Sequence, residues 1–225
     1  MVQTISEKLL DFHCKLLIYS HGSKYINYNG LKNINSILID MEIIKTKFPE
    51  IKRDYLETLQ INIGYKCNQA CSHCHVDAGP NRTEMMSDKV INLIPKVIKA
   101  NNIKMLDITG GAPEIHPKFK QLVREVRSMN VEVMDRCNLT ILTEPGHEDL
   151  ARFLASNKVQ ITASLPCYLK DNVDKQRGKG VFEKSILGLK QLNSHGYGMK
   201  DKDLILNLVY NPSGPQLPPS QKELE

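Results

Sequence analysis

The 225-residue chain contains no tryptophan, few aromatic residues and no long apolar segment. Aromatic residues make up 6% of the sequence, so the stacking platforms that bind single-stranded nucleic acid are not expected. No apolar run approaches the roughly 18 residues that a membrane-spanning helix needs. The net charge of +5 comes from lysines scattered along the chain, which is typical of a solvated surface. We therefore expect no nucleic-acid partner and no membrane contact.

The first ten residues, MVQTISEKLL, lack the basic start and the long apolar core of an export signal. Without such a signal, six cysteines in a chain of this length indicate a reducing compartment, and disulfide bonds are disfavoured. We expect a cytoplasmic protein.

After residue 59 the sequence alternates between short apolar segments and amphipathic stretches, the pattern of strand–helix units around a parallel sheet. We predict an α/β fold. The five predicted strands are residues 59–64, 104–109, 131–135, 159–164 and 204–210.

Four amphipathic helices are predicted between these strands. The first is capped by Ser87 and kinked at Pro95, the second has Pro117 in its first turn, the third opens near His147, and the fourth runs from Val181. Their expected buried residues are Val90, Leu93, Val97 and Ile98; Phe119, Leu122, Val123 and Val126; Leu150, Phe153 and Leu154; and Phe182, Ile186 and Leu189.

Three regions are expected along the chain. Residues 1–55 fit the strand–helix rhythm poorly and form an N-terminal extension of unassigned role, whereas residues 56–211 form the core. Residues 212–225 are rich in proline and polar residues, so we expect a loose tail at which the chain is truncated.

The most informative motif is CxxxCxxC, formed by Cys67, Cys71 and Cys74 directly after the first predicted strand. Three thiolates on one tight loop can each bind one iron of a four-iron four-sulfur cluster, which leaves the fourth iron open to a small molecule. A zinc ion with His73 or His75 as the fourth ligand is an alternative, although no second cysteine pair is present. The segment CSHCH also matches the haem attachment pattern, which belongs to exported proteins.

A glycine turn follows the second predicted strand, in the segment DITGGAPE. Ligands of a parallel sheet gather at the carboxyl ends of its strands, so this turn and the cysteine loop belong to the same edge. Gly110 and Gly111 allow the backbone to approach a ligand closely. The two motifs together indicate a binding site at this edge.

These motifs resemble those of the radical S-adenosylmethionine (SAM) superfamily. The blocks GYKCNQACSHCHVDAGP with TEMMS, TGGAPE, DRCNLTILTEPG, SLPCYLKDNVDKQRGKGVF and NLVYNPSGPQLPP are similar, in order, to the arsenosugar biosynthesis radical SAM proteins. The resemblance covers about residues 55–220. It implies a partial (β/α) barrel with five of six parallel strands in this chain, without the sixth strand and the cysteine-containing C-terminal domain of that family.

Two residues depart from the superfamily pattern. His73 stands where an aromatic residue usually precedes the third cysteine, and this suits the arsenosugar family better than the superfamily at large. Ala112 stands where a glutamate usually binds the amino group of SAM, and the nearest carboxylate along the chain is Glu114.

By this resemblance, Cys67, Cys71 and Cys74 hold a 4Fe-4S cluster, and Gly110 and Gly111 bind SAM through the backbone. The resemblance further implies that SAM is cleaved reductively and that its 5′-deoxyadenosyl group is transferred to a dimethylated trivalent arsenical. SAM is then consumed, and an electron donor such as flavodoxin or ferredoxin is required. No further catalytic residue is assigned.

The resemblance also gives roles to residues after the third and fourth predicted strands. Ser164 and Arg177 match positions that bind polar groups of SAM, and a guanidinium suits the SAM carboxylate; the alternatives are a hydroxyl bonded to its own backbone and a plain surface charge. Cys137 and Cys167 are candidates for binding the arsenical because trivalent arsenic is thiol-seeking, or else they are small buried side chains. Cys14 is interpreted as structural.

Two other functions stay open. One is a radical SAM enzyme that abstracts hydrogen from a peptide or a small molecule, and the other is an inactive iron–sulfur or zinc binding module. The reaction product distinguishes hydrogen abstraction from adenosyl transfer to an arsenical. The metal content after anaerobic reconstitution distinguishes an inactive binding module from either enzyme.

Overall fold

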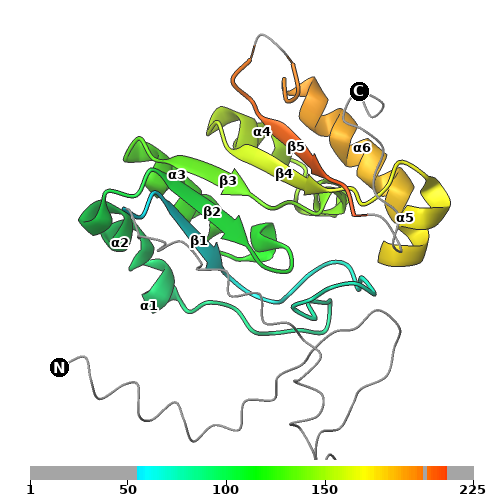
Figure 1. The fold of residues 1–225 in the computed structure, drawn as a ribbon, viewed down its shortest axis with the longest axis horizontal. Coiled ribbons are helices and arrows are strands. Elements are labelled where there is room, and N and C mark those ends of the chain that lie inside the picture. Colours follow the sequence, from blue (N-terminus) through cyan, green and yellow to red (C-terminus); the bar gives the residue numbers. More distant parts are fainter. Residues whose placement is uncertain (1–54, 200–201, 212–225) are drawn as a thin grey trace, which may run out of the picture. The chain divides into compact units, whose positions relative to one another are not determined.

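The structure, a computed structural model, describes residues 55–199 and 202–211. Five parallel strands within these residues form one sheet in the order β1-β2-β3-β4-β5 (Figure 1). The strands are β1 Thr58–Asn62, β2 Met105–Thr109, β3 Glu132–Asp135, β4 Gln160–Ser164 and β5 Leu206–Val209. Each coincides with a predicted strand, so the predicted α/β fold with five parallel strands is confirmed. The tail and nearly all of the N-terminal extension lie outside the described residues.

Helices connect successive strands, as a parallel sheet requires. Because neighbouring strands follow one another in the chain and such connections are right-handed, the helices lie on the same face of the sheet. The helices are α1 Asp88–Ile91, α2 Ile94–Asn101, α3 Phe119–Ser128, α4 Leu150–Ser156, α5 Lys170–Arg177 and α6 Val181–Ser194; two 3₁₀ segments, η4 Pro113–Ile115 and η5 Leu139–Thr143, follow β2 and β3.

The first predicted helix is in fact two short helices, α1 and α2. Pro95 is the second residue of α2 rather than a kink inside one long helix, and its missing N–H is harmless there. Ser87 is the N-cap of α1, but its side chain makes no capping hydrogen bond. The predicted buried face was largely wrong: Val90, Leu93 and Val97 are exposed, while Ile91, Ile94 and Ile98 are buried.

The faces of α3 and α4 are as predicted, since Phe119, Leu122, Val123, Val126, Leu150, Phe153 and Leu154 are all buried. In α6 the buried positions are instead Val181, Ser185, Gly188 and Leu192, and the predicted Phe182, Ile186 and Leu189 flank them half-buried.

Helix α5 has no counterpart among the predicted helices. Its sequence, KDNVDKQR, contains one apolar residue, Val173, which is fully buried. Asp174 accepts hydrogen bonds from the backbone N–H groups of Gly180 (3.0 Å) and Phe182 (2.9 Å), which ties α5 to the start of α6. Polar contacts therefore hold this helix in place, and a pattern of apolar residues does not predict it.

The helix-covered face of the sheet is apolar with one exception. Leu106 and Ile108 of β2 are fully buried and pair in register with Val133 and Asp135 of β3. Because side chains alternate along a strand, Asp135 shares the buried face of Val133. A carboxyl group therefore lies in the layer between sheet and helices.

The opposite face carries a polar ladder across the first three strands. The amide of Gln60 donates to Asp107 (2.6 Å), and Asp107 forms a 2.8 Å ion pair with Arg136. Burial raises the pKa of Asp107, but the hydrogen bonds from Arg136 and Gln60 outweigh it and lower that pKa, so the carboxylate stays charged.

Candidate functional site

The cysteine loop follows β1 and folds back on itself. The backbone N–H of Cys67 donates to the carbonyl of Gly79 (3.1 Å), and the N–H of Gly79 donates to the carbonyl of Tyr65 (3.0 Å). The N–H of Ser72 donates to the carbonyl of Gln176 at the end of α5 (3.0 Å). These bonds position the loop at the carboxyl edge of the sheet, where the sequence predicted it.

Two of the three thiols of the loop accept hydrogen bonds from N–H groups. The Cys67 sulfur, in a residue only 7% exposed, accepts from the backbone of Gln69 (3.4 Å) and from the side-chain amide of Asn138 (3.2 Å). The Cys74 sulfur accepts from the backbone of Ala78 (3.3 Å). Burial raises the pKa of the Cys67 thiol, and the two hydrogen bonds oppose this. N–H donors aimed at sulfur suit cluster-bound thiolates, whose potential such bonds adjust.

The spacing of the three sulfurs also bears on the kind of metal they fit. Two ligands of a single zinc ion lie no more than about 4.5 Å apart, because zinc–sulfur bonds are about 2.3 Å long. Within residues 55–199 and 202–211, Cys67, Cys71 and Cys74 do not form a group with mutual separations of 4.8 Å or less, with or without the neighbouring histidines. The three sulfurs therefore do not present the compact ligand geometry of a single zinc ion.

The glycine turn after β2 packs directly against the cysteine loop. The N–H of Gly111 donates to the carbonyl of Gly64 and that of Ala112 to the carbonyl of Lys66, both at 2.9 Å. A Cβ atom on Gly111 would lie 2.5 Å from the Lys66 carbonyl oxygen. The two amides of the turn are therefore engaged by the cysteine loop, and the two motifs form one packed unit.

Ser164 and Arg177, both predicted to bind SAM, are brought together. Ser164 ends β4, and its backbone carbonyl accepts a hydrogen bond from Nη1 of Arg177. Arg177 is 5% exposed and its Nε has no hydrogen-bond partner. The alternative of a plain surface charge is therefore wrong for Arg177, which is a buried guanidinium beside the cysteine loop.

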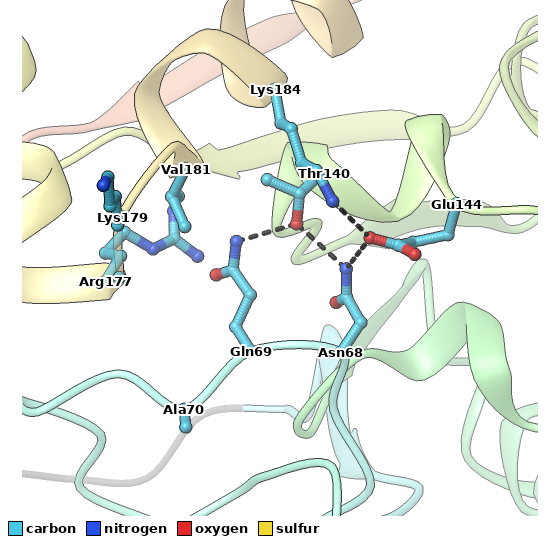
Figure 2. Close-up of a pocket in the computed structure, with 10 residues that line it drawn as sticks. Asn68, Gln69, Ala70, Thr140, Glu144, Arg177, Lys179, Val181 and Lys184 are labelled. Carbon is cyan, nitrogen blue, oxygen red and sulfur yellow. Dashed lines mark hydrogen bonds and ion pairs between the residues drawn. The ribbon is translucent and has the colours of Figure 1, made fainter.

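A cavity of about 270 Å³ lies between the cysteine loop, η5 and the α5–α6 connection (Figure 2). Thr140 Oγ1 accepts from the amides of Asn68 (3.0 Å) and Gln69 (2.7 Å), and Glu144 contacts Asn68 (3.4 Å) and Lys184 (3.3 Å). The lining residues are Asn68, Gln69, Ala70, Thr140, Glu144, Arg177, Gly178, Lys179, Val181 and Lys184.

Most of this lining was missed by the sequence analysis. The signal for it is present in the segments CNQAC and RCNLT, whose amide and hydroxyl side chains meet across the cavity. Asn138 joins the two segments, since its amide donates to Asn68 Oδ1 (2.8 Å) as well as to the Cys67 sulfur.

We expect Asn138→Ala to weaken cluster retention without removing a ligand. The substitution removes the side-chain hydrogen-bond donor to the Cys67 sulfur. Loss of a hydrogen bond to a metal ligand typically lowers metal affinity by about 10–100-fold. The measurement is iron loss from the anaerobic reconstituted protein in competition with a chelator. Asn157→Ala, which removes an amide bonded to the Phe153 carbonyl of α4, is the control; equal iron loss in both variants contradicts the prediction.

The two candidate arsenic-binding cysteines have different surroundings. Cys137 is 0% exposed, and Cys167 is 6% exposed. The Cys167 sulfur accepts from the backbone of Leu169 (3.4 Å) and the amide of Asn172 (3.5 Å) and lies 4.0 Å from the Tyr210 hydroxyl. Burial acts to raise the pKa of Cys167, but these hydrogen bonds outweigh it and lower that pKa.

The pKa of Cys137 is shifted the other way. Burial raises it well above the ordinary value for cysteine, and the charges of Glu114 and Asp135 add to the effect. Glu114 lies with Cys137 in the interior, so it does not take the place of the glutamate that the turn lacks at Ala112.

Comparison with known families accounts for this arrangement. The sequence model of the radical SAM superfamily matches residues 61–207, well over half of the chain. The chain therefore belongs to the radical SAM superfamily. The cofactors of that family are a 4Fe-4S cluster and SAM, the two predicted from the sequence, and the cysteine loop described above fits the cluster.

Curated relatives are similar over part of their length. A probable GTP 3′,8-cyclase of Saccharolobus solfataricus is 27% identical over 136 residues, which is 60% of this chain and 43% of that protein. The mycofactocin maturase MftC of Mycolicibacterium smegmatis is 28% identical over 133 residues, 59% of this chain and 33% of that protein. The chain thus spans less than half the length of these relatives.

Solved structures share the fold. The chain aligns with anSMEcpe with bound AdoMet at a TM-score of 0.53 and 20% identity, covering 70% of this chain and 43% of that one. Streptococcus suis SuiB bound to S-adenosylmethionine gives a TM-score of 0.53 at 17% identity, covering 63% and 32%. The partial-barrel prediction is confirmed by this likeness.

None of the helices in the described part has the length and apolar character to cross a membrane.

Proposed function

We propose that this chain carries the core of an enzyme that transfers the 5′-deoxyadenosyl group of SAM to a dimethylated trivalent arsenical. The observation that carries the proposal is the Cys167 thiol, placed just after the carboxyl end of β4 and surrounded by hydrogen-bond donors. A thiol whose pKa is lowered forms the thiolate more readily, and thiolates are soft ligands for arsenic. The resemblance of the ordered sequence blocks to those of the arsenosugar proteins supports the same substrate.

The proposal assigns distinct tasks to the residues of the carboxyl edge. Cys67, Cys71 and Cys74 would hold the cluster, which with SAM supplies the 5′-deoxyadenosyl group when bound. Gly110 and Gly111 would present carbonyl oxygens to the amino group of SAM. Ser164 and Arg177 would bind the other polar groups of SAM, and the buried guanidinium of Arg177 would attract its carboxylate.

In the proposed reaction both atoms and electrons balance. The C5′–sulfur bond of SAM breaks and methionine leaves, while a bond forms between C5′ and arsenic. Arsenic is oxidised from the trivalent to the pentavalent state, the sulfonium is reduced to a thioether, and the arsenic-bound hydroxyl loses its proton. One electron starts the cycle and one is returned, so an external donor such as flavodoxin or ferredoxin primes the reaction.

The test is anaerobic incubation of the reconstituted protein with reductant, SAM and dimethylarsinous acid, followed by mass spectrometry. The expected product contains arsenic bound to 5′-deoxyadenosine. Free 5′-deoxyadenosine as the main product, without an arsenic adduct, points to hydrogen abstraction from another substrate and contradicts the proposal.

We expect Cys167→Ser to raise the apparent KM for the arsenical by at least about tenfold, the change that a loss of ~1.4 kcal/mol of binding gives. Serine retains the size of the side chain but lacks the soft sulfur ligand. Iron content and reductive SAM cleavage without arsenical are expected to stay unchanged. Ser128→Ala, which removes a hydroxyl bonded to the Glu125 carbonyl of α3, is the control. An unchanged KM in Cys167→Ser excludes this thiol as the arsenical ligand.

A further inference from the structure

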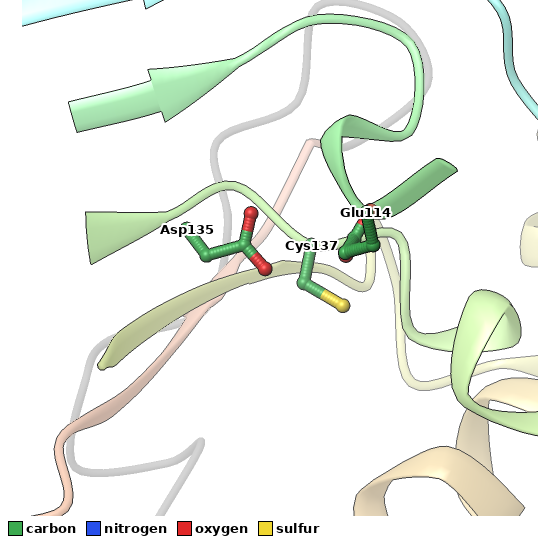
Figure 3. A group of neighbouring side chains, drawn as sticks. All are labelled: Glu114, Asp135 and Cys137. Carbon is green, nitrogen blue, oxygen red and sulfur yellow. The ribbon is translucent and has the colours of Figure 1, made fainter. Parts of the chain in front are cut away.

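The interior of the protein contains a compact group of three ligand-type side chains, Glu114, Asp135 and Cys137. Their ligand atoms lie within 4.8 Å of one another, and the residues are 7%, 0% and 0% exposed (Figure 3). Glu114 comes from η4, Asp135 ends β3, and Cys137 follows two residues later. No other group of this kind occurs in residues 55–199 and 202–211.

All four carboxylate oxygens of Glu114 and Asp135 are buried and without a hydrogen-bond partner. Neither residue forms an ion pair with a lysine or arginine in the part of the chain that the structure describes. Burying a carboxyl group without any partner costs free energy, and native proteins satisfy nearly all such groups. Two unsatisfied carboxyls and a thiol that face one another therefore require an additional partner.

A proton shared between the two carboxyls is the simplest partner, but it does not engage all of their oxygens. A proton held between two carboxyls brings one oxygen of each to about 2.5–2.7 Å in a strong hydrogen bond. The two groups are close enough for such a bond, since a hydrogen bond with Glu114 raises the pKa of Asp135 in addition to burial and to the charge of Glu114. One proton joins only two of the four oxygens, whereas a metal ion binds both carboxylates and the Cys137 thiolate together.

We propose that Glu114, Asp135 and Cys137 bind one divalent metal ion of the zinc type. Zinc takes thiolate sulfur at about 2.3 Å and carboxylate oxygen at about 2.0–2.2 Å, so its ligands lie up to about 4.5 Å apart. A group that spans up to 4.8 Å reaches this geometry by small side-chain shifts. The mixed oxygen and sulfur ligands favour zinc over magnesium or calcium, which prefer oxygen alone.

The proposed ion is separate from the cysteine loop. Asp135 lies on the helix-covered face of the sheet, paired in register with the fully buried Ile108. The next residue after Cys137 is Asn138, whose amide reaches the Cys67 sulfur (3.2 Å). The ion would thus anchor the segment of Cys137 and Asn138 in the core, and the same segment contacts the cluster ligand Cys67 through Asn138. The inference does not depend on the arsenical substrate.

The experiment is metal analysis of the full chain after anaerobic reconstitution and removal of loosely bound metal. We expect about one zinc per chain beside about four irons. Cys137→Ser and Glu114→Gln, which keep the side-chain size, are expected to reduce zinc by at least about tenfold, a loss of ~1.4 kcal/mol or more in binding. Cys167→Ser is the matched control and is expected to keep its zinc.

Zinc bound at the cysteine loop has to be distinguished from zinc in the interior. The triple variant with Cys67, Cys71 and Cys74 replaced by alanine is expected to lose its iron and keep its zinc. Cobalt in place of zinc gives a thiolate charge-transfer absorption in the unsubstituted chain, which the Cys137→Ser variant is expected to lack, so the test does not rest on metal counts alone. Zinc-free holoprotein, or a zinc content unchanged by Cys137→Ser, overturns the proposal.

Discussion

Cys71→Ala is expected to reduce the iron content of the reconstituted protein from about four atoms per chain to less than about one. Cys71 is half-buried, and its thiol donates to Gln69 Oε1 at 3.6 Å. The substitution therefore removes a cluster ligand with little change in packing. Two remaining thiolates leave two irons of the cluster without protein ligands. Reductive cleavage of SAM is expected to fall below detection for the same reason.

The measurement combines iron and sulfide analysis with the visible absorption of the anaerobic protein. Cys167→Ser, a substitution outside the loop, serves as the control and is expected to retain the iron. A Cys71→Ala protein that keeps its iron and its colour excludes the three-cysteine ligand set. Uptake of one zinc and no iron by the unsubstituted protein favours instead the inactive binding module.

The sheet and the place of the cysteine loop were predictable from the sequence for a common physical reason. Parallel strands are short and apolar, so each stands out between amphipathic segments, and loops that follow them meet at the carboxyl edge. Knowing only that Cys67 and Gly111 follow neighbouring strands was enough to place the two motifs together. The backbone bond from Gly111 to Gly64 shows how directly they meet.

The face of the first predicted helix was wrong because its sequence, VINLIPKVI, contains two interleaved apolar stripes. One runs through Val90 and Val97, the other through Ile91 and Ile98, and both fit the helical period. A new helix begins at Ile94, with Pro95 as its second residue, and the residues of the second stripe are the buried ones. Both stripes fit the helical period equally well, so only packing against the rest of the protein determines which one is buried.

The buried trio was not predicted because its members are 21 and 2 residues apart in sequence and meet only through the sheet. A partial signal existed in strand alternation. Val131, Val133 and Asp135 occupy one face of the third strand. Because the two valines are apolar, this alternation predicts that the Asp135 carboxyl lies on the buried face. Arg177 was named from the resemblance, but its burial was not predictable from periodicity, since it ends a helix with a single apolar residue.

Gly111→Ala is expected to destabilise the protein by roughly 1–3 kcal/mol, as overpacking of a close contact does. The added Cβ would lie 2.5 Å from the Lys66 oxygen, 2.9 Å from the Lys66 carbonyl carbon and 3.0 Å from the Ala78 Cβ. Two of these atoms are backbone, so the relief has to come from a shift of the chain next to Cys67. We therefore expect a lower Tm, on the order of 5 °C, together with faster loss of iron.

Gly79→Ala provides the matched control within the same loop. A Cβ on Gly79 meets nothing within 4 Å, and its backbone does not adopt the left-handed conformation, so the same added methyl group is expected to change stability by less than about 0.5 kcal/mol. Thermal unfolding and iron release are measured for both variants. If Gly111→Ala behaves like Gly79→Ala, the close packing of the glycine turn on the cysteine loop does not support the cluster. If only Gly111→Ala loses iron, the two motifs act as one structural unit, since a methyl group on the turn then disturbs ligands on the neighbouring strand's loop.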